Sequence, residues 1–348
     1  MSASSTPAAT RSDAVAELED LTVTFGSTAG DVTVVNGVSF RVGRGEIVAM
    51  VGESGSGKSM TGLAMMGLLP HGARPGGRVT VAGTDILASS EKQLRHVRGA
   101  KVAMVFQDPM TALNPVLKVG DQIDEALTLH HRVSKKAARE RTLEVLNLVG
   151  VPAARERAEQ YPHQWSGGMR QRAVIAMALM DEPDVIIADE PTTALDVTVQ
   201  AQVLEVLQDV RERTGVGILL ITHDLGIVAE VADRVLVMYA GRIVEQGSTA
   251  EIFARTRHPY TRALMVSRAA WAMEHGTDLH AIPGRPPSPR APVPGCSFHP
   301  RCPLASEEAG CLTAVPPLRA VDGERHRSAC HRAELLADET DETEGIPR

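Results

Sequence analysis

The chain is poor in aromatic side chains, in cysteine and in long apolar runs. Aromatic residues make up 3% of its 348 residues, so the hydrophobic 43% must pack mainly as Ala, Val, Leu, Ile and Met. No stretch approaches the roughly 18 consecutive apolar residues of a membrane-spanning helix, and we expect no such helix. The formal net charge of −7 offers no basic surface for nucleic acid, so we expect no nucleic-acid partner.

Changes in composition divide the chain into segments. The start is rich in Ser, Ala and Thr and lacks the apolar centre of a secretory signal. Proline becomes dense from about residue 282, which predicts a stiff linker, and the cysteines follow it. The predicted segments are a flexible leader at 1–14, a main domain at 15–270 with a helical subdomain at about 108–165, a linker at 271–295, a cysteine-rich extension at 296–332 and an acidic tail at 333–348.

Strand-like and helical patterns alternate along the main domain. Polar and apolar residues alternate at 21–25, which is typical of a strand. Short apolar runs at 185–188, 217–221 and 235–239 predict buried strands, with helical stretches between them. Strands that alternate with helices form a largely parallel, doubly wound sheet, so the predicted fold class is α/β.

A glycine-rich octet is the most informative feature of the sequence. It fits the phosphate-binding pattern G-x-x-x-x-G-K-[ST], with an apolar strand expected at 46–51 and a helix at 60–69. In this context backbone N–H groups and the helix N-terminus favour an anion, Lys58 can reach the β and γ phosphates, and the Ser59 hydroxyl can hold Mg²⁺. The predicted nucleotide-binding residues are Gly52, Glu53, Ser54, Gly55, Ser56, Gly57, Lys58 and Ser59.

Two carboxylates follow the apolar run at 185–188. Strands of such sheets end at the ligand crevice, so we expect Asp189 to hold Mg²⁺ and Glu190 to accept a proton from an attacking water. Two acids that merely cap a surface turn are the structural alternative. The octet upstream favours the catalytic interpretation.

A second glycine-rich helix start comprises Ser166, Gly167, Gly168 and Met169. This loop is also suited to binding a phosphate. The structural alternative is an ordinary helix N-cap. One ATP rarely needs two such loops from one chain. We therefore predict a head-to-tail dimer in which this loop covers the nucleotide of the partner subunit.

Three single residues complete the set. Gln107 follows a predicted strand, where its amide could touch Mg²⁺ or water, and His223 follows another, where it could hydrogen-bond the γ-phosphate. Asp196 lies just beyond the predicted base and could bridge subunits. In isolation each residue has a structural explanation, and their order along the chain is what favours function.

These motifs, in this order, resemble those of ABC-transporter ATPase domains. The resemblance covers about 15–270, with Trp165 and Met169 flanking Ser-Gly-Gly where the family often has Leu and Gln. It implies a P-loop NTPase with a mainly parallel core sheet, an N-terminal antiparallel β region and an inserted helical subdomain. It also implies ATP, Mg²⁺, catalytic roles for Glu190, His223 and Gln107, and an adenine-stacking aromatic, for which Phe25 is the candidate.

The C-terminal third resembles the ATPase subunits of oligopeptide, dipeptide and nickel importers. The resemblance rests on His-Pro-Tyr-Thr-Arg-Ala-Leu from 258 and on Pro-Gly-Cys-Ser-Phe-His-Pro-Arg-Cys-Pro from 294. It implies an ATPase that powers peptide uptake through two permease subunits, with a paralogous ATPase subunit and an extracellular or periplasmic substrate-binding protein as partners. The implied location is the cytoplasmic face of the plasma membrane. Import of nickel or another solute, and a soluble ABC ATPase of DNA repair or translation, are the alternatives.

All the cysteines of the chain lie in this extension: Cys296, Cys302, Cys311 and Cys330. Four thiolates suit tetrahedral Zn²⁺, although no tight C-x₂₋₄-C knuckle is present, and they also suit a [4Fe–4S] cluster. Four unrelated buried cysteines are the structural alternative. The resemblance to peptide importers implies the [4Fe–4S] cluster, in a structural role, with Zn²⁺ as the alternative.

Overall fold

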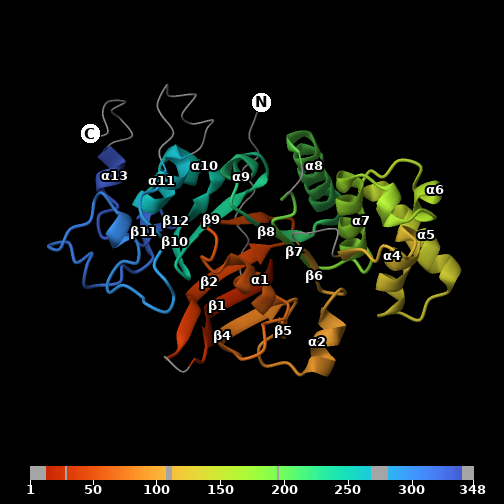
Figure 1. Cartoon of the computed structure of the whole chain (residues 1–348), viewed down its shortest axis with the longest axis horizontal. Coiled ribbons are helices and arrows are strands. Elements are labelled where there is room, and N and C mark those ends of the chain that lie inside the picture. The colour runs from red at the N-terminus through yellow and green to blue at the C-terminus, as the bar shows by residue number, and fades with distance from the viewer. Residues whose placement is uncertain (1–12, 28–29, 107–111, 194–195, 268–280, 339–348) are drawn as a thin grey trace.

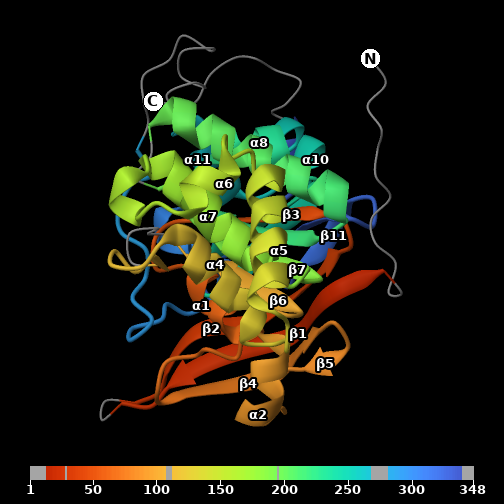
Figure 2. The same cartoon turned by 90° about the vertical axis from the view of Figure 1, so that its right-hand side faces the viewer.

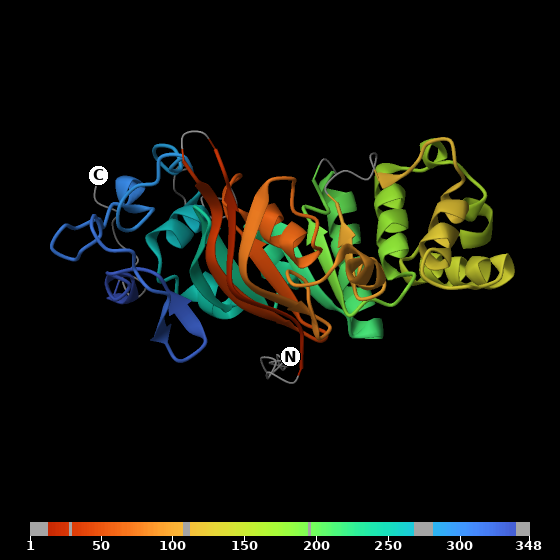
Figure 3. The same cartoon turned by 90° about the horizontal axis from the view of Figure 1, so that it is seen from below.

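The computed structural model describes residues 13–27, 30–106, 112–193, 196–267 and 281–338. Its centre is a large sheet with the strand order β11-β12-β10-β9-β3-β8-β7-β6, and a second sheet has the order β2-β1-β4-β5. The C-terminal segment (blue) and a group of helices (yellow to green) lie at opposite ends of the molecule, with the sheets between them (Figure 3). No helix among the described residues is long and apolar enough to cross a membrane.

The five consecutive strands from β9 to β6 form the parallel part of the large sheet. They are short and almost wholly buried, as expected for strands covered on both faces. Their bounds are β3 Ile47–Val51, β6 Val102–Val105, β7 Val185–Asp189, β8 Gly217–Thr222 and β9 Arg234–Tyr239. The predicted mainly parallel α/β core is confirmed.

The second sheet is antiparallel and comes from the N-terminal part of the chain, as predicted. Its strands are β1 Ala14–Phe25, β2 Val32–Gly43, β4 Ala73–Val81 and β5 Thr84–Asp85. It lies on one side of the large sheet, and most of the helices lie on the other (Figure 2). Helix α1 (Lys58–Met65) contacts strands of both sheets, β4 of the second and β7 and β8 of the large one.

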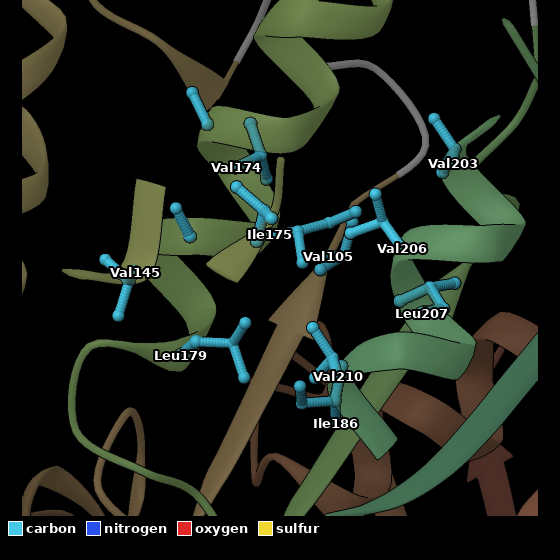
Figure 4. Packing of buried hydrophobic residues seen from close by; sticks show 14 of the residues in the cluster. Val105, Val145, Val174, Ile175, Leu179, Ile186, Val203, Val206, Leu207 and Val210 are labelled. Carbon is cyan, nitrogen blue, oxygen red and sulfur yellow. The ribbon is translucent and has the colours of Figure 1, made fainter. Parts of the chain in front are cut away.

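Side chains that alternate along the strands divide the core between these layers. In β7, Val185 and Ile187 join the core cluster shared with the antiparallel sheet, whereas Ile186 and Ala188 face the opposite cluster. On that opposite face, helix α7 (Gly167–Leu179) packs beside α8 (Val197–Thr214) and against the sheet. Figure 4 shows the apolar side chains of both helices gathered around the β6 and β7 strands.

Among the described residues, four helical segments lie between β6 and α7. Of these, α4, α5 and α6 pack on one another, and α4 and α5 also pack on α7. Ser134 begins α5 by accepting a hydrogen bond from the N–H of Ala137. The segments are α4 Val119–Thr128, α5 Lys135–Leu148, α6 Ala154–Ala158 and η1 Pro162–Gln164.

The C-terminal segment extends the large sheet. Strand β12 (His326–Ser328) pairs with β10 (Arg242–Ser248), and β11 (Arg319–Asp322) pairs with β12. Nε2 of His326 lies 2.8 Å from Oε1 of Glu245, and both side chains are fully buried. The remaining elements are α2 Glu91–Val97, α9 Leu225–Val231, α10 Thr249–Ala254, α11 Pro259–Val266, η2 His299–Arg301 and α13 Leu335–Asp338, which lies in the predicted acidic tail (Figure 1).

Candidate nucleotide-binding site

The octet forms the turn between β3 and α1. Gly57 stands at the N-cap of α1 with φ of 107°, and no side chain caps the helix, so the N–H groups of its first turn face the loop. Gly52 has φ of 153°, and a Cβ there would lie 2.1 Å from the carbonyl oxygen of Met238. Only glycine fits such a position, which explains why the loop needs it.

Lys58 folds back over this loop. Its Nζ donates to the carbonyl oxygens of Gly52, at 2.7 Å, and Glu53, at 3.0 Å. Burial lowers the pKa of Lys58, and the negative charges of Glu190 and Asp189 oppose that shift. Within the described part of the chain, the buried Oγ of Ser56 has no hydrogen-bond partner. A buried hydroxyl without a partner is costly, so the loop is suited to an anion that would satisfy it.

Ser59 and Asp189 meet at the carboxyl ends of the central strands. The Ser59 hydroxyl donates to Oδ1 of Asp189 at 3.1 Å, across 130 residues of sequence. Burial raises the pKa of Asp189, while the Ser59 hydrogen bond opposes that shift. A hydroxyl and a carboxylate are the oxygen ligands that Mg²⁺ prefers, so these two residues fit the ion.

Glu190 is held in an unusual conformation. Its φ is 47°, in the left-handed region that non-glycine residues rarely adopt. Its N–H donates to the carbonyl of Ile221 at 2.8 Å, and the Thr193 hydroxyl donates to Oε2 at 2.8 Å. Nδ1 of His223 lies 3.3 Å from Oε1. Backbone strain that neighbouring groups maintain is common at functional sites.

The second glycine-rich loop starts α7. The Ser166 hydroxyl accepts a hydrogen bond from the N–H of Met169 at 3.4 Å. A Cβ on Gly168 would lie 2.5 Å from Cγ1 of Val199 in α8, so the glycine allows the two helix starts to approach closely. Asp196 caps α8, because its Oδ1 accepts from the N–H of Val199 at 3.0 Å. The structure thus brings the Ser166 loop next to Asp196.

Other predicted residues stand apart from this geometry. Phe25 is the last residue of β1 and is partly buried against the core of the antiparallel sheet. Gln107 lies outside the described residues, as do positions 194 and 195 beside Asp196. The roles assigned to Phe25, Gln107 and Asp196 stay predictions.

Two residues beyond the octet contact it and were not predicted as part of the site. The Tyr260 hydroxyl accepts a hydrogen bond from the N–H of Glu53 at 2.8 Å, and Nη1 of Arg301 lies 3.0 Å from Oε2 of Glu53. Both belong to the C-terminal motifs that resemble peptide importers. That resemblance was the available signal, but nothing in the sequence indicated that Glu53 was their partner.

The prediction of a metal site in the extension is wrong. Among the described residues, no group of three or more His, Cys, Asp or Glu side chains is arranged to hold a metal ion. All four cysteines border one small cavity. Its volume of about 10 Å³ has room for about one water molecule.

Burial also makes deprotonation of three of these thiols less favourable. Burial raises the pKa of Cys296, that of Cys302 to about 11 and that of Cys330 to about 12. A metal or cluster binds thiolates, so the raised pKa values of these three thiols do not favour binding. The predicted [4Fe–4S] cluster and the alternative Zn²⁺ are therefore not supported, and the alternative of structural cysteines agrees with the burial of Cys311 and Cys330.

Comparisons with known proteins identify the family of the chain. A family model described as ABC transporter matches residues 35–193, and one described as oligopeptide/dipeptide transporter, C-terminal region, matches 244–311. The dipeptide transport ATP-binding protein DppD of Bacillus subtilis (strain 168) is 53% identical over 83% of this chain and 87% of its own length. The oligopeptide transport ATP-binding protein OppD of Mycobacterium tuberculosis (strain ATCC 25618 / H37Rv) is 53% identical over 92% of this chain, which spans 52% of that protein.

Solved structures show the same fold. A dimeric ATP-binding cassette in a post-hydrolysis state with ADP and Pi matches with a TM-score of 0.60 and 27% identity, over 67% of this chain and 98% of that one. The cbiO1 subunit of an ABC transporter complex from Clostridium perfringens matches with a TM-score of 0.61 and 28% identity, over 75% of this chain and 99% of that one.

The chain belongs to the family of ABC-transporter ATP-binding proteins. Within that family, it groups with the oligopeptide and dipeptide transport members, to which its similar proteins and the family model that matches residues 244–311 belong. It spans about half the length of the mycobacterial relative and most of the Bacillus one.

Proposed function

We propose that this chain is the ATP-binding and ATP-hydrolysing subunit of an ABC importer for dipeptides and oligopeptides. The observation that carries the proposal is the convergence of Lys58, Ser59, Asp189 and Glu190 at the carboxyl ends of β3 and β7. The similarity to peptide transport proteins supports the substrate class.

The octet binds the triphosphate in this proposal. Lys58 exchanges its hydrogen bonds with the loop carbonyls for bonds to phosphate oxygens, which suits a cation that is already desolvated. Ser59, Asp189 and Gln107 would hold Mg²⁺, which supplies positive charge to the phosphate oxygens. Phe25 is the candidate for stacking on adenine.

Glu190 is the general base. Its carboxylate is oriented by the Thr193 hydroxyl and lies beside His223, so the proton acceptor has a fixed direction. His223 acts from an exposed position next to Glu190, with its side chain 64% exposed, where a γ-phosphate can approach it.

The functional unit is a pair of ATPase subunits. Ser166, Gly167, Gly168 and Met169 would cover the nucleotide of a second subunit, paralogous in this proposal, with Asp196 at the junction. The similar cassette that was solved as a dimer supports this arrangement. ATP then binds the closed pair better than the open one, and hydrolysis releases it.

Translocation belongs to other chains in this proposal. Two permease subunits form the path, a substrate-binding protein outside the membrane delivers peptide, and this chain lies at the cytoplasmic face of the plasma membrane. The names of the relatives as transport ATP-binding proteins support these partners.

The experiment is to co-purify the chain with its membrane partners and measure ATP hydrolysis in vesicles with the substrate-binding protein present. Peptides should stimulate hydrolysis, and Ni²⁺ should not. Stimulation by Ni²⁺ alone would transfer the proposal to the nickel alternative. Hydrolysis that needs no membrane partner and responds to nucleic acid would favour a soluble ABC ATPase instead.

A further inference from the structure

The phosphate loop is held from outside the nucleotide-binding region. Glu53, the second residue of the octet, receives two contacts from the C-terminal part of the chain. Arg301 contacts its carboxylate across 248 residues of sequence, and Tyr260 contacts its N–H across 207 residues. Neither partner is near the octet in sequence, so only the fold creates these contacts.

Arg301 is a buried cation, and Glu53 is its counter-ion. The side chain of Arg301 is 5% exposed, and that of Glu53 is 23% exposed. The guanidinium also donates to the carbonyl of Pro283 at 2.8 Å and to the Tyr239 hydroxyl at 3.3 Å. Its central carbon lies 5.8 Å from the ring centroids of Tyr239 and Phe298. A buried charge depends strongly on its partner, because removing that partner leaves the charge uncompensated.

An aromatic cluster fixes the position of these donors. The ring of Tyr239 lies 4.5 Å from that of Tyr260 and 5.3 Å from that of Phe298. All three side chains are fully buried, and Phe298 comes from the C-terminal segment itself. Packed aromatic rings allow little movement, so Arg301 and the Tyr260 hydroxyl hold Glu53 at a defined place.

The fixed residue is part of the lysine's binding site. Nζ of Lys58 donates to the carbonyl of Glu53, while the N–H and the carboxylate of Glu53 are held by Tyr260 and Arg301. The N–H, carbonyl and carboxylate of one residue therefore have separate partners. A shift of Glu53 would displace Lys58 before ATP binds, together with the neighbouring N–H groups of the proposed phosphate site.

We propose that Arg301 is a positioning residue for the phosphate loop, through which the C-terminal segment sets the affinity for ATP. This inference rests on the proposed nucleotide-binding function. Preorganisation of the loop reduces the ordering cost of binding. Linkage makes the effect reciprocal, so bound nucleotide should stabilise the segment around Arg301.

The test is a double-mutant cycle in the full-length chain with Glu53→Gln and Arg301→Met. Each single change should weaken binding of a fluorescent ATP analogue about tenfold, the size expected for one charged hydrogen bond. The double variant should bind the analogue with about the same affinity as the single variant that binds it less tightly, because both changes remove the same interaction. KM for ATP should rise more than kcat falls, and Arg301→Lys should recover part of the affinity.

Arg257→Met is the matched control. Arg257 is another buried arginine of the C-terminal region, with a side chain 9% exposed, and it pairs with Asp322 rather than with the octet. The Arg257→Met variant should have lower thermal stability, but its affinity for the analogue should stay near that of the wild type. Equal losses of affinity in Arg257→Met and Arg301→Met, or additive losses in the cycle, would overturn the inference.

A second measurement needs no variant. A non-hydrolysable ATP analogue should slow amide hydrogen exchange of residues 298–302 in the wild-type chain, and unchanged exchange there with nucleotide bound would contradict the coupling. The two proposals fail differently. A wild-type chain that binds no nucleotide overturns the proposed function, whereas one that binds it with an affinity unaffected by Arg301→Met overturns only this inference.

Discussion

At the scale of single residues, Glu190 combines an unusual backbone conformation with the proposed role of general base. Its left-handed backbone is held by the hydrogen bond to Ile221, and its carboxylate by Thr193 and His223. Strain of this kind costs about 1–3 kcal/mol and persists only where surrounding groups maintain it. The arrangement is what a base with a fixed direction requires.

Replacement of Glu190 by Gln should therefore separate binding from chemistry. The amide keeps the shape but accepts no proton, so the ATPase rate should fall by about 10²–10⁴-fold while ATP binding is retained. Glu182→Gln is a matched control, because Glu182 also has a left-handed backbone, with φ of 50°, but pairs with Arg141. Turnover near the wild-type rate in Glu190→Gln would remove it as the base.

At the scale of elements, α11 shows how the C-terminal region is joined to the core. Nδ1 of His258 accepts a hydrogen bond from the N–H of Tyr260 at 3.1 Å and so caps the helix. The side chain is buried, and burial lowers the pKa of His258 to about 3. The cap therefore requires the neutral ring.

This shift predicts a loss of stability in acid. Between pH 6.5 and about pH 3 the unfolded chain protonates His258 while the folded chain does not, so the free energy of unfolding falls as the pH falls. Above pH 6.5 this histidine does not make the free energy of unfolding depend on pH. Below pH 6.5 it lowers that free energy by about 1.4 kcal/mol per pH unit. His258→Asn keeps a capping acceptor but cannot titrate. Its urea-unfolding free energy should depend less steeply on pH between 6.5 and 5, and an unchanged slope would contradict the assignment.

At the scale of the whole molecule, the two loops proposed to bind phosphate lie on different elements. The octet joins β3 to α1 inside the layered core, whereas the Ser166 loop starts α7, which packs beside the helical group α4–α6 (Figure 1). This separation agrees with the proposal that one loop binds the chain's own nucleotide and the other covers that of a partner.

A hydrolysis-deficient chain should therefore pair in the presence of nucleotide. Glu190→Gln, mixed with its partner ATPase subunit, Mg²⁺ and ATP, should sediment as a dimer, because ATP is retained between the subunits. The same chain with Lys58→Ala added should sediment as a monomer, and so should one with Ser166→Arg, which fills the covering loop. If the nucleotide-loaded Glu190→Gln chain stays monomeric, the proposed pairing is wrong.

The sequence by itself determined the class of the fold and the order of the nucleotide motifs. Hydrophobic periodicity and the glycine octet are local patterns, and local sterics decide where a strand must turn into a helix around bound phosphate. The sequence could not show that Glu190 lies beside His223 or that Arg301 pairs with Glu53, because those contacts join residues far apart in the chain.

Only the tertiary structure decided what the C-terminal segment contacts. Four cysteines in one short region predicted a metal or cluster, but among the described residues they form no group arranged to hold one, and burial raises the pKa of Cys302 and Cys330. Arg301, which lies beside Cys302 in sequence, contacts Glu53 of the phosphate loop. Spacing along a chain indicates which residues are able to come into contact. The packed core fixes the burial and direction of each side chain, and these determine which contacts form.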